Sequence, residues 1–255
     1  MNWALTKNNR SVALKNIPPF SVDVLHAQIV DEYRKGKRII GFFGTKVPDG
    51  ITLFAVLADD AGSRLLIAQC SLKNEQIFHS LTPEVPAVHL FEREIFEQFG
   101  IKPLGHPWLK PVRYPFDRYD PSQTPSNYPF FKLEGEEIHE VGVGPIHAGV
   151  IEPGHFRFMC LGEKIHHLEI QLGYQHRGME ALFLAKPLPG ASRFQPHLAE
   201  SIASDSAVGH AMAYAQAIES LTGTEISREA MAVRAIALEL ERVAVHIGDL
   251  GAISQ

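Results

Sequence analysis

The chain has 255 residues, of which 45% are hydrophobic and 21% are charged. This composition is typical of a soluble globular protein with one large or two modest domains, and it excludes disordered and collagen-like chains. The formal net charge of −5 leaves no basic excess to neutralise phosphates, which argues against nucleic acid as the main partner. The two cysteines, Cys70 and Cys160, are far apart, so the sequence predicts neither a disulfide framework nor a cysteine-built metal cluster.

The N-terminal part has the patterns of a mixed α/β domain. Ser21 is a good N-cap for a helix that extends to about Lys35, and Pro86 opens a second helix that ends before Gly100. Three apolar, β-prone runs predict strands at residues 38–43, 51–58 and 64–72. The run Asp59-Asp60-Ala61-Gly62 predicts a hairpin between the last two strands.

A proline-rich stretch follows, with prolines at positions 111, 115, 121, 125 and 129. Prolines remove backbone donors and restrict φ, so we expect an extended tether there. The stretch is also rich in Tyr and Arg, which favours packing along a surface. We therefore divide the chain into a domain at 1–110, a tether at 111–130 and a second domain at 131–255.

The second domain is predicted to contain a hairpin and long helices. Strands are expected at 155–161 and 164–171 around Gly162, and helices at 172–186, at 196–222 before Gly223, and after Ser227. The predicted fold class is α+β, with a mixed α/β domain followed by a hairpin and a long-helix bundle. The two long helices cannot bury their apolar faces against one hairpin, so we expect a truncated chain or one completed by partners.

Four segments, in one order, resemble a single superfamily. The run EREIFEQFGIKPLGHPWLKPVRYP (92–115) resembles the end of the C-type subunit of respiratory complex I, a domain without a cofactor. GPIHAGVIEPGHFRF (144–158) and LGYQHRGME (172–180) resemble the start of the D-type subunit of complex I, which is homologous to the large subunit of energy-converting NiFe hydrogenases. EISREAMAVRAIALELERVAVHIGDLG (225–251) resembles the next helix of both. A fusion of C-like and D-like parts fits the hydrogenase side.

The chain departs from that family where the hydrogenases bind nickel. Their Cys-x-x-Cys pair aligns with Ala203 and Ser206, and neither residue can replace a soft thiolate ligand. The tyrosine that complex I presents to the quinone headgroup aligns near Ile202. The sequence therefore predicts no metal bound by this chain, and it places quinone reduction in doubt together with hydrogen chemistry.

The resemblance implies three residues for proton transfer. Glu152 occupies the place of a family glutamate beside the metal cavity, where burial can raise a carboxyl pKa toward neutrality. His147 and His155 compete for the place of a histidine that faces quinone, and an imidazole can protonate a reduced quinone oxygen. The alternatives are a loop carboxylate that caps or pairs with an arginine, and hydrogen-bonded structural histidines.

The resemblance also implies a set of residues beside the terminal iron–sulfur cluster of a partner subunit. Arg177 would raise that cluster's reduction potential, because a guanidinium favours the electron-rich state. Glu180 is expected on the same helical side and could orient Arg177, and His246 matches a family histidine near the cluster. An ordinary salt bridge is the alternative for Arg177. For His246, with Arg234, Glu239 and Arg242, the alternative is an ion-pair ladder against a partner.

These features predict a subunit of a complex I-like or hydrogenase-related respiratory complex on the cytoplasmic side of a membrane. The partners would be an iron–sulfur subunit and membrane-arm subunits, with quinone as a candidate ligand in a cavity between subunits. The chain itself would hold no cofactor. A second hypothesis is a non-catalytic assembly subunit that has lost its active site, and a nickel hydrogenase is a distant third.

Overall fold

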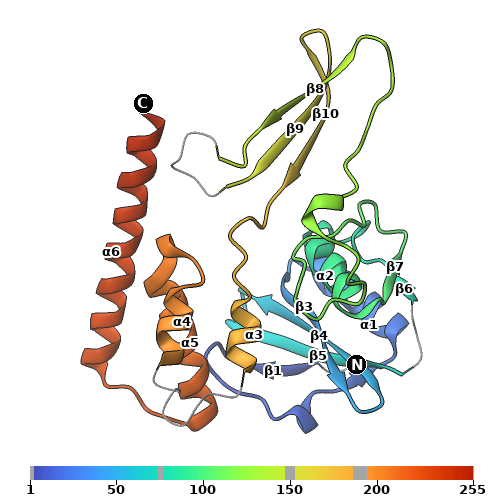
Figure 1. Ribbon diagram of the computed structural model, residues 1–255. Coiled ribbons are helices and arrows are strands. Elements are labelled where there is room, and N and C mark those ends of the chain that lie inside the picture. The colour runs from blue at the N-terminus through green and yellow to red at the C-terminus, as the bar shows by residue number, and fades with distance from the viewer. Residues whose placement is uncertain (1–2, 74–76, 147–152, 186–193, 255) are drawn as a thin grey trace. The chain divides into compact units, whose positions relative to one another are not determined.

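The computed structural model describes residues 3–73, 77–146, 153–185 and 194–254. The chain separates into two compact units, Met1–Asn8 with Val12–Gln175 and Asn9–Ser11 with His176–Gln255, and each is described by itself (Figure 1). The predicted mixture of α and β structure is confirmed, since sheets and six α-helices occur in the described residues. The domain boundary predicted at residues 111–130 lies within the first unit, and it stays a prediction.

The first unit is built on a five-stranded sheet with the strand order β1-β5-β4-β3, and β2 also pairs with β5. The strands of the main path are antiparallel, whereas β2 runs parallel to β5. The three predicted strands are confirmed, and β1 and β2 carry no sequence signal that predicts them. The bounds are β1 (Ala4–Thr6), β2 (Pro19–Phe20), β3 (Arg38–Val47), β4 (Gly50–Asp59) and β5 (Arg64–Leu72).

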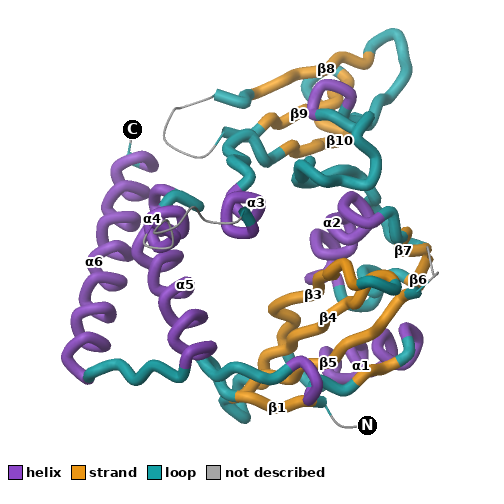
Figure 2. Tube along the Cα trace, turned by 60° about the horizontal axis from the view of Figure 1, so that its bottom comes forward, coloured by secondary structure: helices purple, strands orange, loops and turns teal. Residues whose placement is uncertain are grey.

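Helix α1 (Val22–Arg34) packs against this sheet (Figure 2). It begins as predicted after Ser21, whose hydroxyl accepts a hydrogen bond from the Val24 amide at 3.4 Å. Its buried side chains join the hydrophobic core of the unit together with apolar residues of β4 and β5. The principal members are Leu25, Ile29, Val30, Leu53, Ala55, Leu57, Leu66, Ala68 and Cys70.

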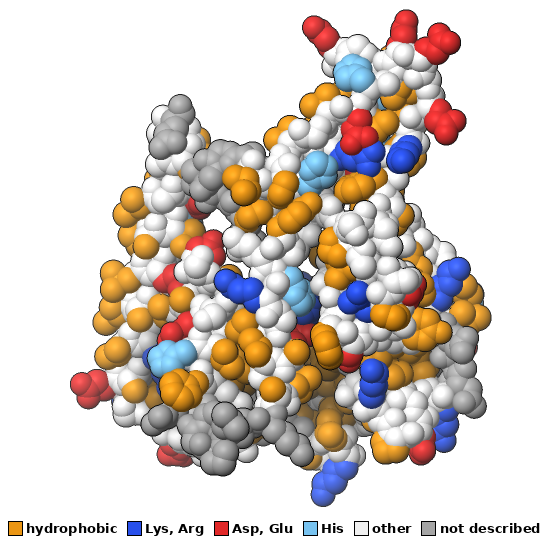
Figure 3. Space-filling view, viewed as in Figure 1, with side chains coloured by type: hydrophobic (Ala, Val, Ile, Leu, Met, Phe, Trp, Pro, Cys, Tyr) orange, Lys and Arg blue, Asp and Glu red, His pale blue; other side chains and the backbone are white. Residues whose placement is uncertain are grey.

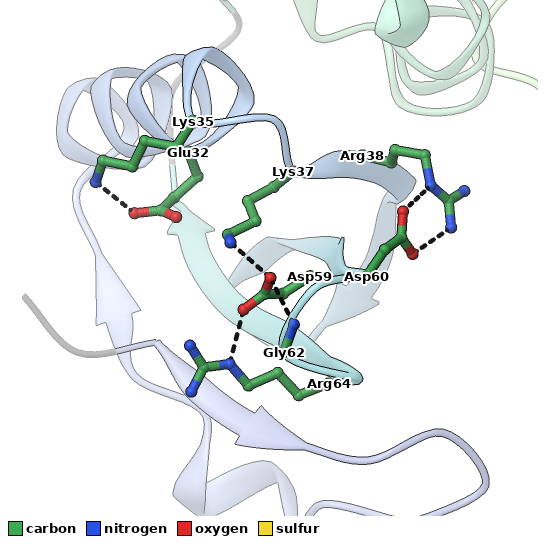
Figure 4. A network of polar contacts seen from close by, with 8 residues as sticks. All are labelled: Glu32, Lys35, Lys37, Arg38, Asp59, Asp60, Gly62 and Arg64. Atoms are coloured by element: carbon green, nitrogen blue, oxygen red, sulfur yellow. Dashed lines mark hydrogen bonds and ion pairs between the residues drawn. The ribbon is translucent and has the colours of Figure 1, made fainter.

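The predicted hairpin between β4 and β5 is held by Asp59, whose side chain is only 3% exposed. Its carboxylate accepts hydrogen bonds from Lys37 Nζ at 2.6 Å, Arg64 Nε at 2.8 Å and the Gly62 amide at 3.2 Å (Figure 4). The bond from Lys37 is the main cause that lowers the pKa of Asp59 to about 2, and the bond from Arg64 follows. The charge of this carboxylate therefore stabilises the hairpin.

Helix α2 (His89–Phe99) follows a 3-10 turn at Pro86–Val88, as the helix predicted from Pro86 requires. It ends at Gly100, whose φ of 74° is the left-handed conformation expected of a helix-ending glycine. A short parallel pair, β6 (Ile77–His79) and β7 (Lys102–Leu104), lies on either side of it in the sequence.

Two carboxylates of α2 are buried, and each binds a neighbouring segment. Glu92 is fully buried and accepts hydrogen bonds from Ser80 Oγ at 2.6 Å, the Leu81 amide at 2.6 Å and Thr82 Oγ1 at 2.5 Å. This carboxylate therefore fixes the turn that follows β6. Because each oxygen of Glu92 has a donor, its burial is compensated by hydrogen bonding.

Glu97 binds the start of the proline-rich stretch in the same way. Its carboxylate accepts three consecutive backbone amides, from Val112 at 3.2 Å, Arg113 at 3.0 Å and Tyr114 at 2.6 Å. Tyr114 has a φ of 50°, a left-handed conformation that these bonds help to hold. We call residues 108–131 the strap. It packs along α2, as the Tyr- and Arg-rich composition predicts.

The first unit also contains a three-stranded antiparallel sheet with the order β10-β9-β8. Its hairpin around Gly162 is confirmed with the predicted bounds, β9 (His155–Leu161) and β10 (Lys164–Gln171). The third strand, β8 (Ile138–Val143), was not predicted.

The second unit is helical, with α3 (Met179–Leu184), α4 (Gln195–Glu200), α5 (Ala207–Thr222) and α6 (Arg228–Ile253). The helix predicted at 172–186 is wrong over its first half, because Gly173 and Gly178 have φ values of 94° and 67° that interrupt a helix. The single helix predicted at 196–222 is also wrong. It breaks at residues 201–206, where Ser201 Oγ donates to the His197 carbonyl at 2.8 Å and Ala203 is extended with a φ of −149°. The ends of the two long helices agree with prediction. Gly223 is left-handed with a φ of 70°, and Ser227 Oγ accepts the Ala230 amide at 3.1 Å.

Asp59→Asn should remove the part of the free energy of unfolding that requires an ionised carboxylate at this position. Since the pKa of Asp59 is lowered from 3.8 to about 2 in the folded chain, its stabilisation is complete above about pH 4. The stabilisation is lost as the pH falls through the folded value. Urea denaturation at several pH values should show a constant gap between wild type and Asp59→Asn at neutral pH, which closes toward pH 2. Asp60→Asn, at an exposed pair with Arg38, is the matched control and should have a smaller effect.

Glu97→Gln should lower the free energy of unfolding by about 2 to 4 kcal/mol, because an amide cannot accept all three strap amides. Glu94→Gln is the control on the same helix, since Glu94 is 28% exposed and pairs with Arg113 at the surface. Its cost should be at most about 1 kcal/mol. Equal losses for the two variants in urea denaturation would show that Glu97 does not hold the strap.

Candidate functional site

Two of the residues predicted for proton transfer, Glu152 and His147, lie outside the described residues. Their roles stay predictions. The third, His155, opens β9, and its Cα lies opposite that of Gln171 on β10.

The geometry of His155 fits a proton-transfer role. Its half-buried ring has Nδ1 at 3.4 Å from the carbonyl oxygen of Gly144, and since that oxygen can only accept, Nδ1 is the donor. The ring also meets Phe130 edge-on at a centroid distance of 5.7 Å. A histidine held in one orientation, with one nitrogen able to take a proton, is equally compatible with the structural alternative.

Arg177 lies in the loop before α3, and its side chain is exposed. Its Nη2 donates a hydrogen bond to the Ile202 carbonyl at 3.0 Å, across 25 residues of sequence. The structure therefore brings Arg177 to Ile202, near which the sequence predicts the place of the quinone tyrosine of complex I. The expectation that Arg177 and Glu180 share one helical side is wrong, because α3 begins at Met179 and Gly178 is left-handed. Glu180 lies in the first turn of α3.

The sequence predicts that the hydrogenase thiolates would align with Ala203 and Ser206. In the structure this segment forms local hydrogen bonds. Ser206 precedes α5, and His210 Nδ1 lies 2.9 Å from the Ser206 carbonyl and 3.1 Å from its hydroxyl. Glu241, from α6, accepts the amides of Val208 at 2.5 Å and Gly209 at 3.0 Å. A carboxylate thus caps the N-terminus of α5, where the helix dipole favours negative charge. Within the described ranges, no group of three or more His, Cys, Asp and Glu side chains is arranged to hold a metal ion.

His246 is exposed on α6. The expected ladder around it takes a different form, because Arg234 pairs with Glu219 of α5 through two hydrogen bonds of 2.6 and 3.0 Å. This pair lowers the pKa of Glu219 and raises that of Arg234. Arg242 pairs with Glu239 on the same helix, and both side chains are largely exposed. One part of the ladder therefore joins α5 to α6 instead of serving a partner.

Sequence reasoning did not predict the roles of three carboxylates, Glu97, Glu169 and Glu241. Each accepts hydrogen bonds from a distant segment of the chain. Their donors are 15 to 59 residues away in the sequence, so no local pattern identifies them. The predicted residues fall in both units, with His155 in the first and Arg177, Glu180 and His246 in the second.

Comparison with known proteins identifies the N-terminal part. The family described as "Respiratory-chain NADH dehydrogenase, 30 Kd subunit" matches residues 21–127. These residues form a domain of that family. The match spans α1, strands β3 to β5, α2 and most of the strap. The predicted resemblance to the C-type part of complex I is confirmed.

The chain is also similar to subunits of hydrogenase and NADH dehydrogenase complexes. Formate hydrogenlyase subunit 5 of Escherichia coli is 30% identical over 272 residues, which cover 96% of this chain and 46% of that protein. Hydrogenase-4 component G of the same organism is 32% identical over 191 residues, covering 68% of this chain and 34% of that protein. The C/D-type subunit of the NADH-quinone oxidoreductase of Bacteroides thetaiotaomicron is 27% identical over 217 residues, covering 68% of this chain and 40% of that protein.

These relatives confirm the predicted resemblance to fused C/D-type subunits and to hydrogenase subunits. The chain spans between a third and a half of the length of the relatives named here. None of the described helices combines the length and the apolarity that crossing a membrane requires.

Glu241→Gln should loosen the start of α5, because the charged cap of Val208 and Gly209 becomes a weaker amide acceptor. We expect a loss of about 1 to 2 kcal/mol in the free energy of unfolding and faster hydrogen exchange at these two amides. Glu239→Gln, two residues earlier on the solvent side of α6, is the control and should leave both amides protected. Unchanged exchange in Glu241→Gln would mean that the cap contributes nothing in solution.

Proposed function

We propose that this chain is a subunit of a membrane-associated electron-transfer complex of the complex I or membrane-bound hydrogenase type. It helps to form the cavity beside a partner's iron–sulfur cluster, where electrons meet quinone or protons. The observation that carries the proposal is the similarity to formate hydrogenlyase subunit 5 over 96% of the chain. NADH:quinone oxidoreductase and hydrogen-forming chemistry are both represented among the relatives.

Uncovered apolar surface supports a place in a larger assembly. On α6, exposed apolar side chains recur at intervals of three and four residues and form a continuous stripe, visible along that helix in Figure 3. Its members are Val233, Ile236, Leu240, Val243, Ile247 and Leu250, each at least 48% exposed. Apolar faces of this extent usually mark interfaces.

The sheet β8–β10 offers a second such surface. Two rows of apolar residues cross its three strands on one face, and the members on β8 and β10 are more than 40% exposed. The rows are Val141 with Phe158 and Leu168, and Val143 with Phe156 and Ile170. In the assembly that we propose, partner subunits cover these faces.

Within that assembly, each candidate residue has a definite task. Arg177 is exposed and can stand beside a partner's cluster, with Glu180 and His246 on the same unit. His155, and by resemblance Glu152 and His147, supply proton transfer to the reduced acceptor. Residues 131–255 would have a fold of the complex I D-type or hydrogenase large-subunit kind. The chain would be peripheral on the cytoplasmic side and bound to membrane-arm subunits. The cluster and any quinone would belong to partners or to the shared cavity.

The alternative is a non-catalytic scaffold or assembly subunit of such a complex. It is favoured by Ala203 and Ser206 at the thiolate positions and by the Glu241 cap on the adjacent helix. A nickel hydrogenase is the weakest candidate for the same reason. Purification of the intact complex, with analysis of its metals, bound quinone and turnover, distinguishes these functions. A complex that contains this chain but turns over equally well without it would support the scaffold.

Arg177→Met should lower the reduction potential of the partner's cluster by tens of millivolts while assembly is retained. The estimate follows from a unit charge at about 6 Å in a medium of effective dielectric near 20, reduced by solvent screening. Arg177→Lys keeps the charge and a donor for the Ile202 carbonyl, so it should shift the potential much less. Redox titration followed by electron paramagnetic resonance on the assembled complex measures the effect. An unchanged potential in the Met variant would make Arg177 a structural residue and favour the scaffold.

A further inference from the structure

The polar face of the β8–β10 sheet is the buried one, which is the reverse of the usual arrangement. The strap packs on this face, where Arg157, Glu169 and Gln171 are each less than 9% exposed. The apolar rows described above lie on the other face. Met159 is buried on the same face, but the buried polar and charged side chains outnumber it. Directional polar contacts therefore contribute to how the sheet lies on the strap.

Glu169, in the middle of β10, makes the central contact. Its side chain is 2% exposed, and both oxygens bind the strap. Oε1 accepts Lys110 Nζ at 2.5 Å, and Oε2 accepts the backbone amide of Phe131 at 2.6 Å. One carboxylate thus holds the strap near both of its ends.

Several contacts also hold Lys110 in place. Its Nζ lies 4.2 Å from the ring centroid of Trp108 and 5.5 Å from that of Tyr128, so two aromatic faces also bind the ammonium. Its backbone carbonyl accepts Arg93 Nε of α2 at 2.8 Å. The pair is therefore connected through the strap to the helix that organises the first domain.

We propose that Glu169 and Lys110 form a positioning pair that orients the β8–β10 sheet on the first domain, and with it His155. Glu169 lies two residues before Gln171, whose Cα is opposite that of His155. A buried ion pair adds little net stability compared with apolar residues of similar volume, but it can specify one geometry. The orientation itself is independent of the proposed function, and only its consequence for proton transfer rests on that function.

The first test uses the full chain. The chain has two tryptophans, so in a Trp3→Phe background Trp108 reports on the ammonium above its ring. Glu169→Gln leaves Lys110 buried without its counter-charge. It should change the emission of Trp108, increase its quenching by acrylamide, and raise hydrogen exchange at β10 amides on the order of 100-fold. Arg38→Met, at an exposed ion pair in the other sheet, is the matched control and should change none of these.

Two double variants separate positioning from ordinary charge burial. Lys110→Met with Glu169→Leu removes both charges, so global stability in urea should recover while Trp108 emission and β10 exchange stay altered. The exchanged pair, Lys110→Glu with Glu169→Lys, should fail to recover them. A lysine cannot accept the Phe131 amide, and a carboxylate is repelled by aromatic faces. Recovery of emission and exchange in either double variant would overturn the proposal.

The consequence for function is tested in the assembled complex. With the proposed function correct, Glu169→Gln should lower turnover several-fold while the composition of the complex and the cluster potential stay unchanged. Normal turnover in a complex whose β10 exchange is raised would overturn the link from the pair to His155. If the chain is instead absent from any such complex, the proposed function fails while the result on the isolated chain stands.

Discussion

Three consecutive backbone amides of the strap converge on the carboxylate of Glu97, and the position of the strap on α2 depends on this contact. The prolines prevent this stretch from forming regular secondary structure. Its remaining backbone amides therefore need hydrogen-bond acceptors from elsewhere. Glu97 supplies that acceptor from a helix already anchored by Ile95 and Val88 in the core. A flexible tether thereby becomes a fixed surface on which a second sheet can be placed.

That second sheet is joined to the strap by polar contacts, and this explains its unusual polarity. Arg157 pairs with Glu140 across the sheet and lies over the Phe130 ring, and Glu169 binds Lys110. With its polar residues satisfied by the strap, the sheet can leave its apolar rows at the surface. In a protein that functions alone this would be a liability, whereas in a multisubunit complex it provides an interface.

Sequence patterns predicted the elements whose signals are local. Ser21 and Ser227 cap helices, Gly100 and Gly223 end them, and the bounds of β9 and β10 agree with the alternation and the turn at Gly162. The errors also have local physical causes. Two left-handed glycines interrupt the helix predicted at 172–186, and the extended Ala203 separates the two helices found in the range predicted at 196–222. Helical periodicity alone does not register either effect.

The candidate site was predicted less well, because its contacts join distant parts of the sequence. Arg177 and Glu180 were placed on one helix by spacing, yet the bond that Arg177 makes is to Ile202, which no spacing rule suggests. Lys110 and Glu169 are 59 residues apart, and neither stands in a motif that predicts the other. Motif resemblance selected these segments, but only the fold shows which side chains in them meet.

The start of α5 bears most directly on what the chain does. By the resemblance described above, the thiolate pair of the hydrogenases would lie just before this helix, where negative charge suits the positive end of the helix dipole. Here Glu241 supplies the negative charge from within the chain, to the amides of Val208 and Gly209. The start of α5 therefore has an anionic partner from α6 within the described residues. The Glu241 cap stabilises a helix end whether or not the chain takes part in catalysis. The exposed Arg177, which donates to the Ile202 carbonyl, has no such structural requirement. The choice between an electron-transfer role and an assembly role therefore depends on the arginine, and not on the scaffold around it.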